Sequence, residues 1–250
     1  MSIDTLIRTA PTPPAEFAWA WALERPASDT LNVRVLPALD AAAAKPPRAD
    51  ELILWFGLPG TAGWPDLLGH LGDDEQVRAA RFHFAADRWA FAAAHAGLRA
   101  LLGRMLACPP RRLRFATGAH GKPHLDRNRH DTDVAFNISH TRGCVAIAVA
   151  RRAVGIDVEQ RRTLPDLMDL ARIAFGPEAQ DALAALAGPQ ARTLLFYRYW
   201  TLGEAFIKAT GEGIGQGLSS FAFTEHGAPA LTRIGAAWGP MERWRFHCEP

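Results

Sequence analysis

Lysine is scarce in this chain of 250 residues. Of its 28 basic residues only Lys45, Lys122 and Lys208 are lysine, and the rest are arginine. Lysine meets phosphate as a compact point charge, whereas arginine offers a flat fork of donors. The few lysines that remain therefore mark the segments around Lys122 and Lys208 as candidate phosphate contacts.

Cysteine, net charge and long apolar runs are also limited. Cys108, Cys144 and Cys248 are odd in number and widely spaced, which favours a reduced, cytoplasmic protein over a disulfide framework. A formal net charge of +2 favours neither a nucleic-acid nor a membrane partner. The apolar runs are shorter than the roughly 18 to 20 residues of a membrane span, and the N-terminus shows no pattern of a secretory signal.

The first 50 residues differ in composition from the rest. They contain seven prolines and an unbroken alanine run at 41–44. Such a segment buries little apolar surface. We therefore expect residues 1–50 to be a poorly ordered Pro- and Ala-rich extension, despite Trp19 and Trp21.

From residue 51 onward, helical and strand patterns alternate. A strand is expected at 52–56 and helices from 73 and over 86–107, followed by strands at 113–116, 135–138, 144–150 and 153–158. The last two flank Arg151-Arg152 and predict a hairpin. Helices are expected at 164–174, 177–186 and 189–210, the last ended by Gly211, with short strands near Phe221 and Trp244. This order predicts an α+β fold with an N-terminal half at 51–152 and a C-terminal half at 153–250.

Asp157 and Glu159 are set into the apolar run Val154–Val158. Residues two apart on a strand share a face, and the run is typical of a strand buried on both faces. Two acids at a strand end usually face solvent. On a buried strand, however, unpaired carboxylates cost several kcal/mol unless a cation neutralises them. Oxygen ligands of this kind suit Mg²⁺.

Glu204 and Lys208 are four residues apart on a predicted helix. This spacing is that of an ordinary surface ion pair worth about 0.2 to 0.5 kcal/mol. The helix is apolar on nearly every side, however, which is typical of a buried helix. We therefore expect the ion pair to face a cleft.

Two loops carry further candidates. Asn137-Ile138-Ser139-His140 follows a predicted strand, and these side chains are common turn formers. A Ser139–His140 nucleophile pair is weakly supported, because adjacent strand residues point apart and no glycine elbow surrounds the serine. Gly118–Pro123 reads first as a turn, whose Gly121 and Lys122 could equally approach a phosphate.

Together these segments resemble the phosphopantetheinyl transferases of the surfactin-synthetase-activator type. The matching pieces occur in family order: Arg78 to Phe82 with Asp87, Gly121 to Pro123, Phe136 to His140, Gly155 to Glu159, and Trp200 to Gly213. The resemblance implies a monomer of two pseudo-twofold-related α+β halves with coenzyme A between them. It also implies transfer of 4′-phosphopantetheine from coenzyme A to a serine of an acyl or peptidyl carrier protein, with release of 3′,5′-ADP.

The resemblance also implies the role of each matched residue. Asp157, Glu159 and Glu204 would hold Mg²⁺ in the C-terminal half. Glu204 and Lys208 would be catalytic, Glu204 as the base for the carrier serine and Lys208 beside the bridging phosphates. The contacts to coenzyme A would come from Arg78, Gly121, Lys122, Asn137, Ser139, His140 and Lys208.

Two alternatives remain. One is a metal-dependent phosphodiester hydrolase that uses the same carboxylates, against which the near-neutral charge argues. The other is a non-enzymatic, carrier-binding relative. It is suggested by Gly203, where the family usually has lysine, and by the end of the sequence at Pro250, where the family tends to add a strand.

Overall fold

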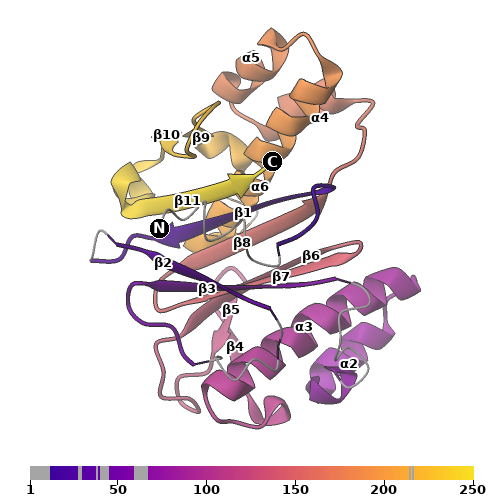
Figure 1. Cartoon of the computed structure of the whole chain (residues 1–250), viewed down its shortest axis with the longest axis vertical. Helices are drawn as coiled ribbons and strands as arrows, with labels where there is room; N and C mark the ends of the chain where they lie inside the picture. Colours follow the sequence, from indigo (N-terminus) through magenta and orange to yellow (C-terminus); the bar gives the residue numbers. More distant parts are fainter. Residues whose placement is uncertain are drawn as a thin grey trace.

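The computed structural model describes residues 12–27, 30–37, 39, 45–58, 67–213, 215 and 217–250. Its strands are β1 (Phe17–Glu24), β2 (Asn32–Leu36), β3 (Glu51–Gly57), β4 (Phe115–Thr117), β5 (Pro123–Leu125), β6 (Ala135–Thr141), β7 (Cys144–Ala150), β8 (Val154–Gln160), β9 (Ala222–Phe223), β10 (Leu231–Arg233) and β11 (Trp244–Glu249). Its α-helices are α2 (Asp73–Ala80), α3 (Ala85–Met105), α4 (Leu167–Ala174), α5 (Pro177–Ala185) and α6 (Pro189–Thr210). The strands occupy the middle of the molecule, with α2 and α3 at one end and α4 and α5 at the other (Figure 1).

Two main sheets carry the core. One has the strand order β2-β3-β7-β6 and the other β11-β1-β8. On the first sheet, Ile53 and Trp55 pack under α3. On the second, alternate alanines of β1 pack under α6. Between the sheets, Trp19 and Trp21 of β1 pack with Leu54 of β3, so the order of layers is helix, sheet, sheet, helix. The predicted α+β fold is confirmed.

The prediction for residues 1–50 is wrong for the two strands that the structure describes there. β1 is the middle strand of its sheet, paired with β8 on one side and β11 on the other. In the sequence Phe17–Leu23, tryptophans alternate with alanines, so one face fills the core while the other lets α6 approach. Residues 1–11 and 40–44 lie outside the described part of the chain.

The predicted hairpin of β7 and β8 is also wrong. β7 pairs with β3 and β6, whereas β8 pairs with β1 in the other sheet. The short link at Arg151–Ala153 therefore passes from one sheet to the other. A run of alternating strands cannot show this, because β1, the true partner of β8, lies far away in the sequence.

The last long helix follows its sequence signals closely. α6 has a proline in its first turn and ends at Gly211, whose φ of 78° is the left-handed conformation that glycine tolerates. Among the described helices, none combines the length and apolarity needed to cross a bilayer.

Candidate active site

β8 and α6 approach each other closely at Gly155. A Cβ on Gly155 would lie 1.9 Å from the carbonyl oxygen of Ala205 and 2.5 Å from the amide nitrogen of Ala209. Successive strand residues point to opposite faces, so Asp157 and Glu159 share the α6-facing side of β8 with Gly155. The close approach therefore brings both carboxylates to the helix that carries the other candidate site residues.

Asp157 is buried, and one of its oxygens is held by two donors. Its Oδ1 accepts a hydrogen bond from the Ser139 hydroxyl at 2.9 Å and from Lys208 Nζ at 2.6 Å. Nζ also donates to Ser139 Oγ at 3.2 Å. The predicted ion pair of Lys208 with Glu204 is therefore wrong: its partner is Asp157, because β8 places a carboxylate closer to Nζ than the helix does.

Three carboxylates share this site and outnumber the ammonium beside them. Burial raises the pKa of Glu159 to about 7, and the negative charge of Asp157 adds to the rise, while Lys208 and a hydrogen bond from Trp200 oppose it. Burial also raises the pKa of Glu204; Lys208 lowers it and Asp157 raises it. Within the described structure, Asp157 Oδ2 is buried without a hydrogen-bond partner. When all three carboxylates are ionised, their negative charge exceeds the positive charge of Lys208 beside them.

Asp157, Glu159 and Glu204 have the chemistry to bind a divalent cation. Their side chains, however, are not arranged around a common point where such an ion would bind. Among the described residues, no three His, Cys, Asp or Glu side chains are arranged so that they could hold a metal ion. Lys208 stands at Asp157 Oδ1 instead. Carboxylate oxygens are nevertheless the ligands that Mg²⁺ prefers. The orphaned Oδ2 and the raised pKa values of Glu159 and Glu204 mark the charge that such an ion would offset.

Charged groups of the N-terminal half lie within electrostatic range of His140, as does Lys208. Loss of solvation lowers the pKa of His140, and the charges of His95, Lys208 and Arg78 lower it further, while Asp87 raises it. These mutual effects place the predicted coenzyme A contacts Arg78 and His140 in one neighbourhood with Lys208. Taken as a whole residue, His140 still exposes part of its surface to solvent.

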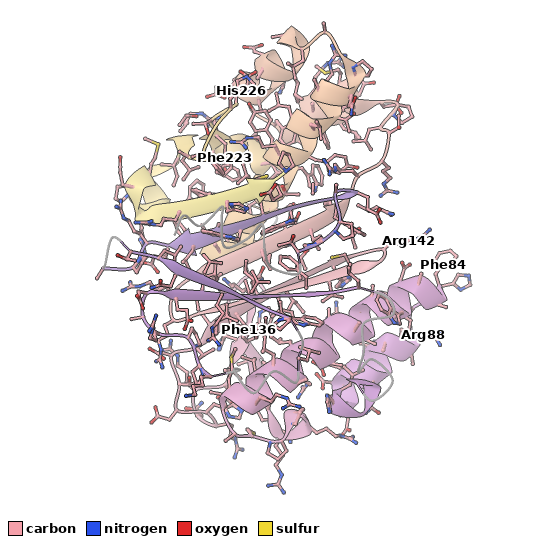
Figure 2. All side chains as sticks on the ribbon, in the orientation of Figure 1. Phe84, Arg88, Phe136, Arg142, Phe223 and His226 are labelled. Carbon is pink, nitrogen blue, oxygen red and sulfur yellow. The ribbon has the colours of Figure 1, made fainter. Side chains whose placement is uncertain are left out.

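Exposed side chains lie at the start of α3 and at the turn after β6. Figure 2 labels Phe84 and Arg88 at the start of α3 and Arg142 at the turn after β6. Phe84 is 64% exposed, which is unusual for a phenylalanine. These exposed residues are two arginines and a phenylalanine.

His95 is a neighbour that the sequence reasoning missed. Its Nδ1 lies 3.0 Å from Glu75 Oε1, and its ring centroid lies 4.1 Å from that of Phe91. The Arg78 guanidinium sits 5.1 Å from the centre of the same Phe91 ring. The available signal was the four-residue spacing of Phe91 and His95, which places them on one face of α3.

Lys122 lies between the two elements that carry the carboxylates. Its Nζ donates to the carbonyl oxygens of Val154, at the start of β8, and Ala209, in the last turn of α6, at 3.0 and 3.1 Å. The carbonyls of a last helical turn lack helical partners and attract a cation. Burial lowers the pKa of Lys122 to about 8. Gly121 precedes it with a φ of 83°, as a turn requires. Contact of this loop with a phosphate stays a prediction.

Asn137 and Ser139 have their side chains engaged within the protein. Both are 7% exposed. Asn137 Oδ1 accepts the amide of Ile156 at 2.8 Å, and Ser139 contacts Asp157 as described above. Their predicted contact with coenzyme A stays a prediction.

Gly203 has a packing role. A Cβ there would lie 2.4 Å from Cδ2 of Leu218 and 3.3 Å from Cε2 of Phe221. The segment after α6 therefore covers this position, and a lysine could not be accommodated without moving Leu218. Leu218 and Phe221 therefore occupy the space that a side chain at position 203 would need.

Comparisons with known proteins match two adjacent stretches of the chain. The family model described as 4'-phosphopantetheinyl transferase superfamily matches residues 153–249, and the model described as 4'-phosphopantetheinyl transferase, N-terminal, matches residues 57–152. The two models meet at the link between β7 and β8.

Several curated proteins are similar over most of the chain. The 4'-phosphopantetheinyl transferase HetI of Nostoc sp. (strain PCC 7120) is 34% identical over 206 residues, which cover 79% of this chain and 86% of the relative. A 4'-phosphopantetheinyl transferase of Bacillus subtilis is 28% identical over 68% of this chain and 73% of its own length. The L-aminoadipate-semialdehyde dehydrogenase-phosphopantetheinyl transferase of Homo sapiens is 30% identical, over 66% and 56% respectively. This chain belongs to the 4'-phosphopantetheinyl transferase family.

Proposed function

We propose that this enzyme transfers 4′-phosphopantetheine from coenzyme A to a serine of an acyl or peptidyl carrier protein and depends on Mg²⁺. The observation that supports it best is the excess of buried and partly buried carboxylates beside Lys208, on two elements that lie within the residues matched by the family model. Such a charge distribution suits a metal-bound pyrophosphate.

The reaction breaks one bond of the pyrophosphate and forms one to the carrier. The serine hydroxyl oxygen of the carrier attacks the phosphorus that bears the pantetheine arm. The bond from that phosphorus to the bridging oxygen breaks, and 3′,5′-ADP leaves with the electron pair. Mg²⁺, held by Asp157, Glu159 and Glu204, would neutralise the phosphate oxygens.

Lys208 supports the departure of 3′,5′-ADP. Its ammonium is partly exposed, with 27% of the side chain accessible, so one side faces Asp157 and Ser139 while a phosphate can approach another. Positive charge aimed at the bridging oxygen stabilises the negative charge that develops there. Arg78 and His140, on the N-terminal side, would meet the other phosphates.

Glu204 is the proposed base for the serine. Its pKa is raised by burial, which makes this carboxylate a better proton acceptor than an exposed glutamate. It would take the hydroxyl proton directly or through a water molecule. Release of the product carrier would then return the proton to solvent.

The test is incubation of the purified chain with coenzyme A, Mg²⁺ and apo-carrier proteins from fatty-acid, polyketide and nonribosomal peptide synthesis. We expect intact mass spectrometry to show one phosphopantetheine arm added to at least one carrier, and we expect chelation of Mg²⁺ to stop the addition. Release of 3′,5′-ADP without any carrier would instead indicate a phosphodiester hydrolase. Binding of coenzyme A without transfer to any carrier would indicate a non-enzymatic relative.

A further inference from the structure

The free edges of the two main sheets meet where β6 lies beside β8. β8 ends the order β11-β1-β8 and β6 ends the order β2-β3-β7-β6. An edge strand leaves a row of backbone groups without ladder partners. In an antiparallel pair, successive amides point alternately toward the partner strand and away from it. Every second amide of β8 therefore points away from β1.

Three side chains of β6 accept those amides. The acceptors are two residues apart on β6, and so are the donors on β8. Asn137 Oδ1 accepts from the Ile156 amide at 2.8 Å, Ser139 Oγ from the Val158 amide at 3.3 Å, and Thr141 Oγ1 from the Gln160 amide at 3.4 Å. We call these three acceptors the side-chain seam. It takes the place of a backbone ladder between the two halves.

The alternation of side chains along β6 places the three acceptors of the seam on one face and His140 on the other. Asn137, Ser139 and Thr141 share one face of the strand, whereas His140 lies on the opposite face. The first two acceptors are buried, with 7% exposed each. A buried amide without an acceptor is costly, so β8 depends on these side chains to stay at this edge.

The seam leads directly into the active site. Asp157 lies between the two amides that Asn137 and Ser139 accept. The Ser139 hydroxyl also donates to Asp157 Oδ1 and accepts from Lys208 Nζ. Each of its hydrogen-bonding positions is thus used within the protein.

We propose that Asn137 and Thr141, on either side of Ser139, are positioning residues that hold β8 at the register in which Asp157 meets Lys208. Asn137 then acts on the reaction through the backbone of β8, without contact to coenzyme A. The effect on turnover rests on the proposed function, whereas the seam itself can be tested without any substrate.

The first experiment measures amide hydrogen exchange of the substrate-free protein. Asn137→Leu keeps the approximate size of the side chain but removes the acceptor, and Thr141→Val does the same at the other end. We expect exchange of the Ile156 amide to rise roughly tenfold or more in the first variant, and that of the Gln160 amide to rise in the second. Asn137→Asp keeps an acceptor oxygen and should retain most of the protection at Ile156.

A matched control lies in the β9–β10 hairpin. Thr224 Oγ1 accepts the amide of Ala230 at 3.2 Å, also from side chain to backbone. Thr224→Val should leave exchange at Ile156 and Gln160 unchanged. If Asn137→Leu fails to fold, Asn137→Asp and Thr141→Val still test whether the seam protects the amides of β8. Each of these two variants leaves the other acceptors of the seam in place.

The second experiment separates positioning from binding. For Asn137→Leu we expect kcat to fall about tenfold or more while KM for coenzyme A changes less than about threefold, and Asn137→Asp to recover part of kcat. A raised KM with unchanged exchange at Ile156 would overturn the proposal in favour of direct contact with coenzyme A. If the wild-type chain transfers nothing, the proposed function fails, and the exchange results still accept or reject the seam.

Discussion

The two long helices of this protein carry buried charge in opposite ways. Beside α3, burial alone would raise the pKa of Glu75, yet hydrogen bonds from His95, the Gly72 amide and Arg99 hold it below its ordinary value. Arg99 Nε lies 2.5 Å from Glu75 Oε2, and Arg99 also donates to two backbone carbonyls. This cluster is internally neutralised, which is typical of a structural ion pair.

Beside α6 the balance is reversed. Glu159 and Glu204 have raised pKa values, and Asp157 keeps an oxygen without a partner. Similar residue types therefore serve two purposes in one molecule. Where donors match acceptors the charges stabilise the fold, and where carboxylates are in excess they are available to a ligand.

The largest expected effect comes from Asp157→Asn, which keeps the shape of the side chain and removes its charge. We expect transfer to fall by a factor on the order of 10³ or more, because the pyrophosphate loses its ionic support. Mg²⁺ should also raise the melting temperature of the wild-type chain but not of this variant. Thermal shifts with and without Mg²⁺, together with the carrier mass assay, measure both effects. Asp181→Asn, an exposed carboxylate of α5, is the control, and equal Mg²⁺ shifts in both variants would remove Asp157 from the metal site.

The contact of each helix with its sheet offers a second comparison. Gly155→Ala would place a methyl group 1.9 Å from a backbone oxygen of α6, whereas at Gly97 on α3 the nearest atom is Cζ3 of Trp55 at 3.2 Å. We expect Gly155→Ala to cost more than about 3 kcal/mol of unfolding free energy or to prevent folding. Gly97→Ala should cost less than about 2 kcal/mol, since the indole can shift and alanine favours the helix. Urea denaturation of the two variants checks this, and equal costs would contradict the close approach of β8 and α6.

Replacing a glutamate beside α3 and one on α6 should change the free energy of unfolding differently. Glu75→Gln leaves the buried Arg99 guanidinium without its counter-charge, and we expect a loss of about 3 kcal/mol. Glu204→Gln removes a carboxylate from surroundings that disfavour it, so stability should stay the same or rise slightly. Chemical denaturation at neutral pH without Mg²⁺ compares the pair. Similar losses from both variants would mean that the two clusters do not differ in the way described.

The smallest expected effect depends on pH and on Lys122. Its pKa in the folded protein is about 8, below the ordinary value of 10.5. The unfolded chain therefore binds more protons than the folded chain between these values, so the contribution of Lys122 to stability rises with pH across that window. The stability of the wild type relative to Lys122→Met should thus increase from below pH 8 to near pH 10.5, as measured by urea denaturation. A constant difference would show that the ammonium is not desolvated by β8 and α6.

Much of the local structure could be predicted from the sequence. The apolar surroundings of α6, its proline in the first turn and Gly211 at its end are short-range signals, and they locate the helix well. The run Val154–Glu159 likewise indicates a buried strand with two carboxylates on one face. These predictions rest on periodicity, which depends only on neighbouring residues.

Pairing across the chain could not be predicted in the same way. Prolines around β1 indicate disorder, yet they stand outside the strand and leave its ladder to β8 and β11 intact. The helical spacing of Glu204 and Lys208 indicates an ion pair, but a carboxylate from β8 displaces it. In both cases a partner distant in sequence outcompetes the local preference.

The sequence by itself determined which side chains carry charge into apolar elements, and the order of motifs that marks the family. Only the tertiary structure decided which of these charges are paired, because pairing depends on the close approach at Gly155 and on the side-chain seam between β6 and β8. Those contacts join segments that meet in space only after both sheets have formed. Their energies depend on burial and distance, which no local pattern of residues contains.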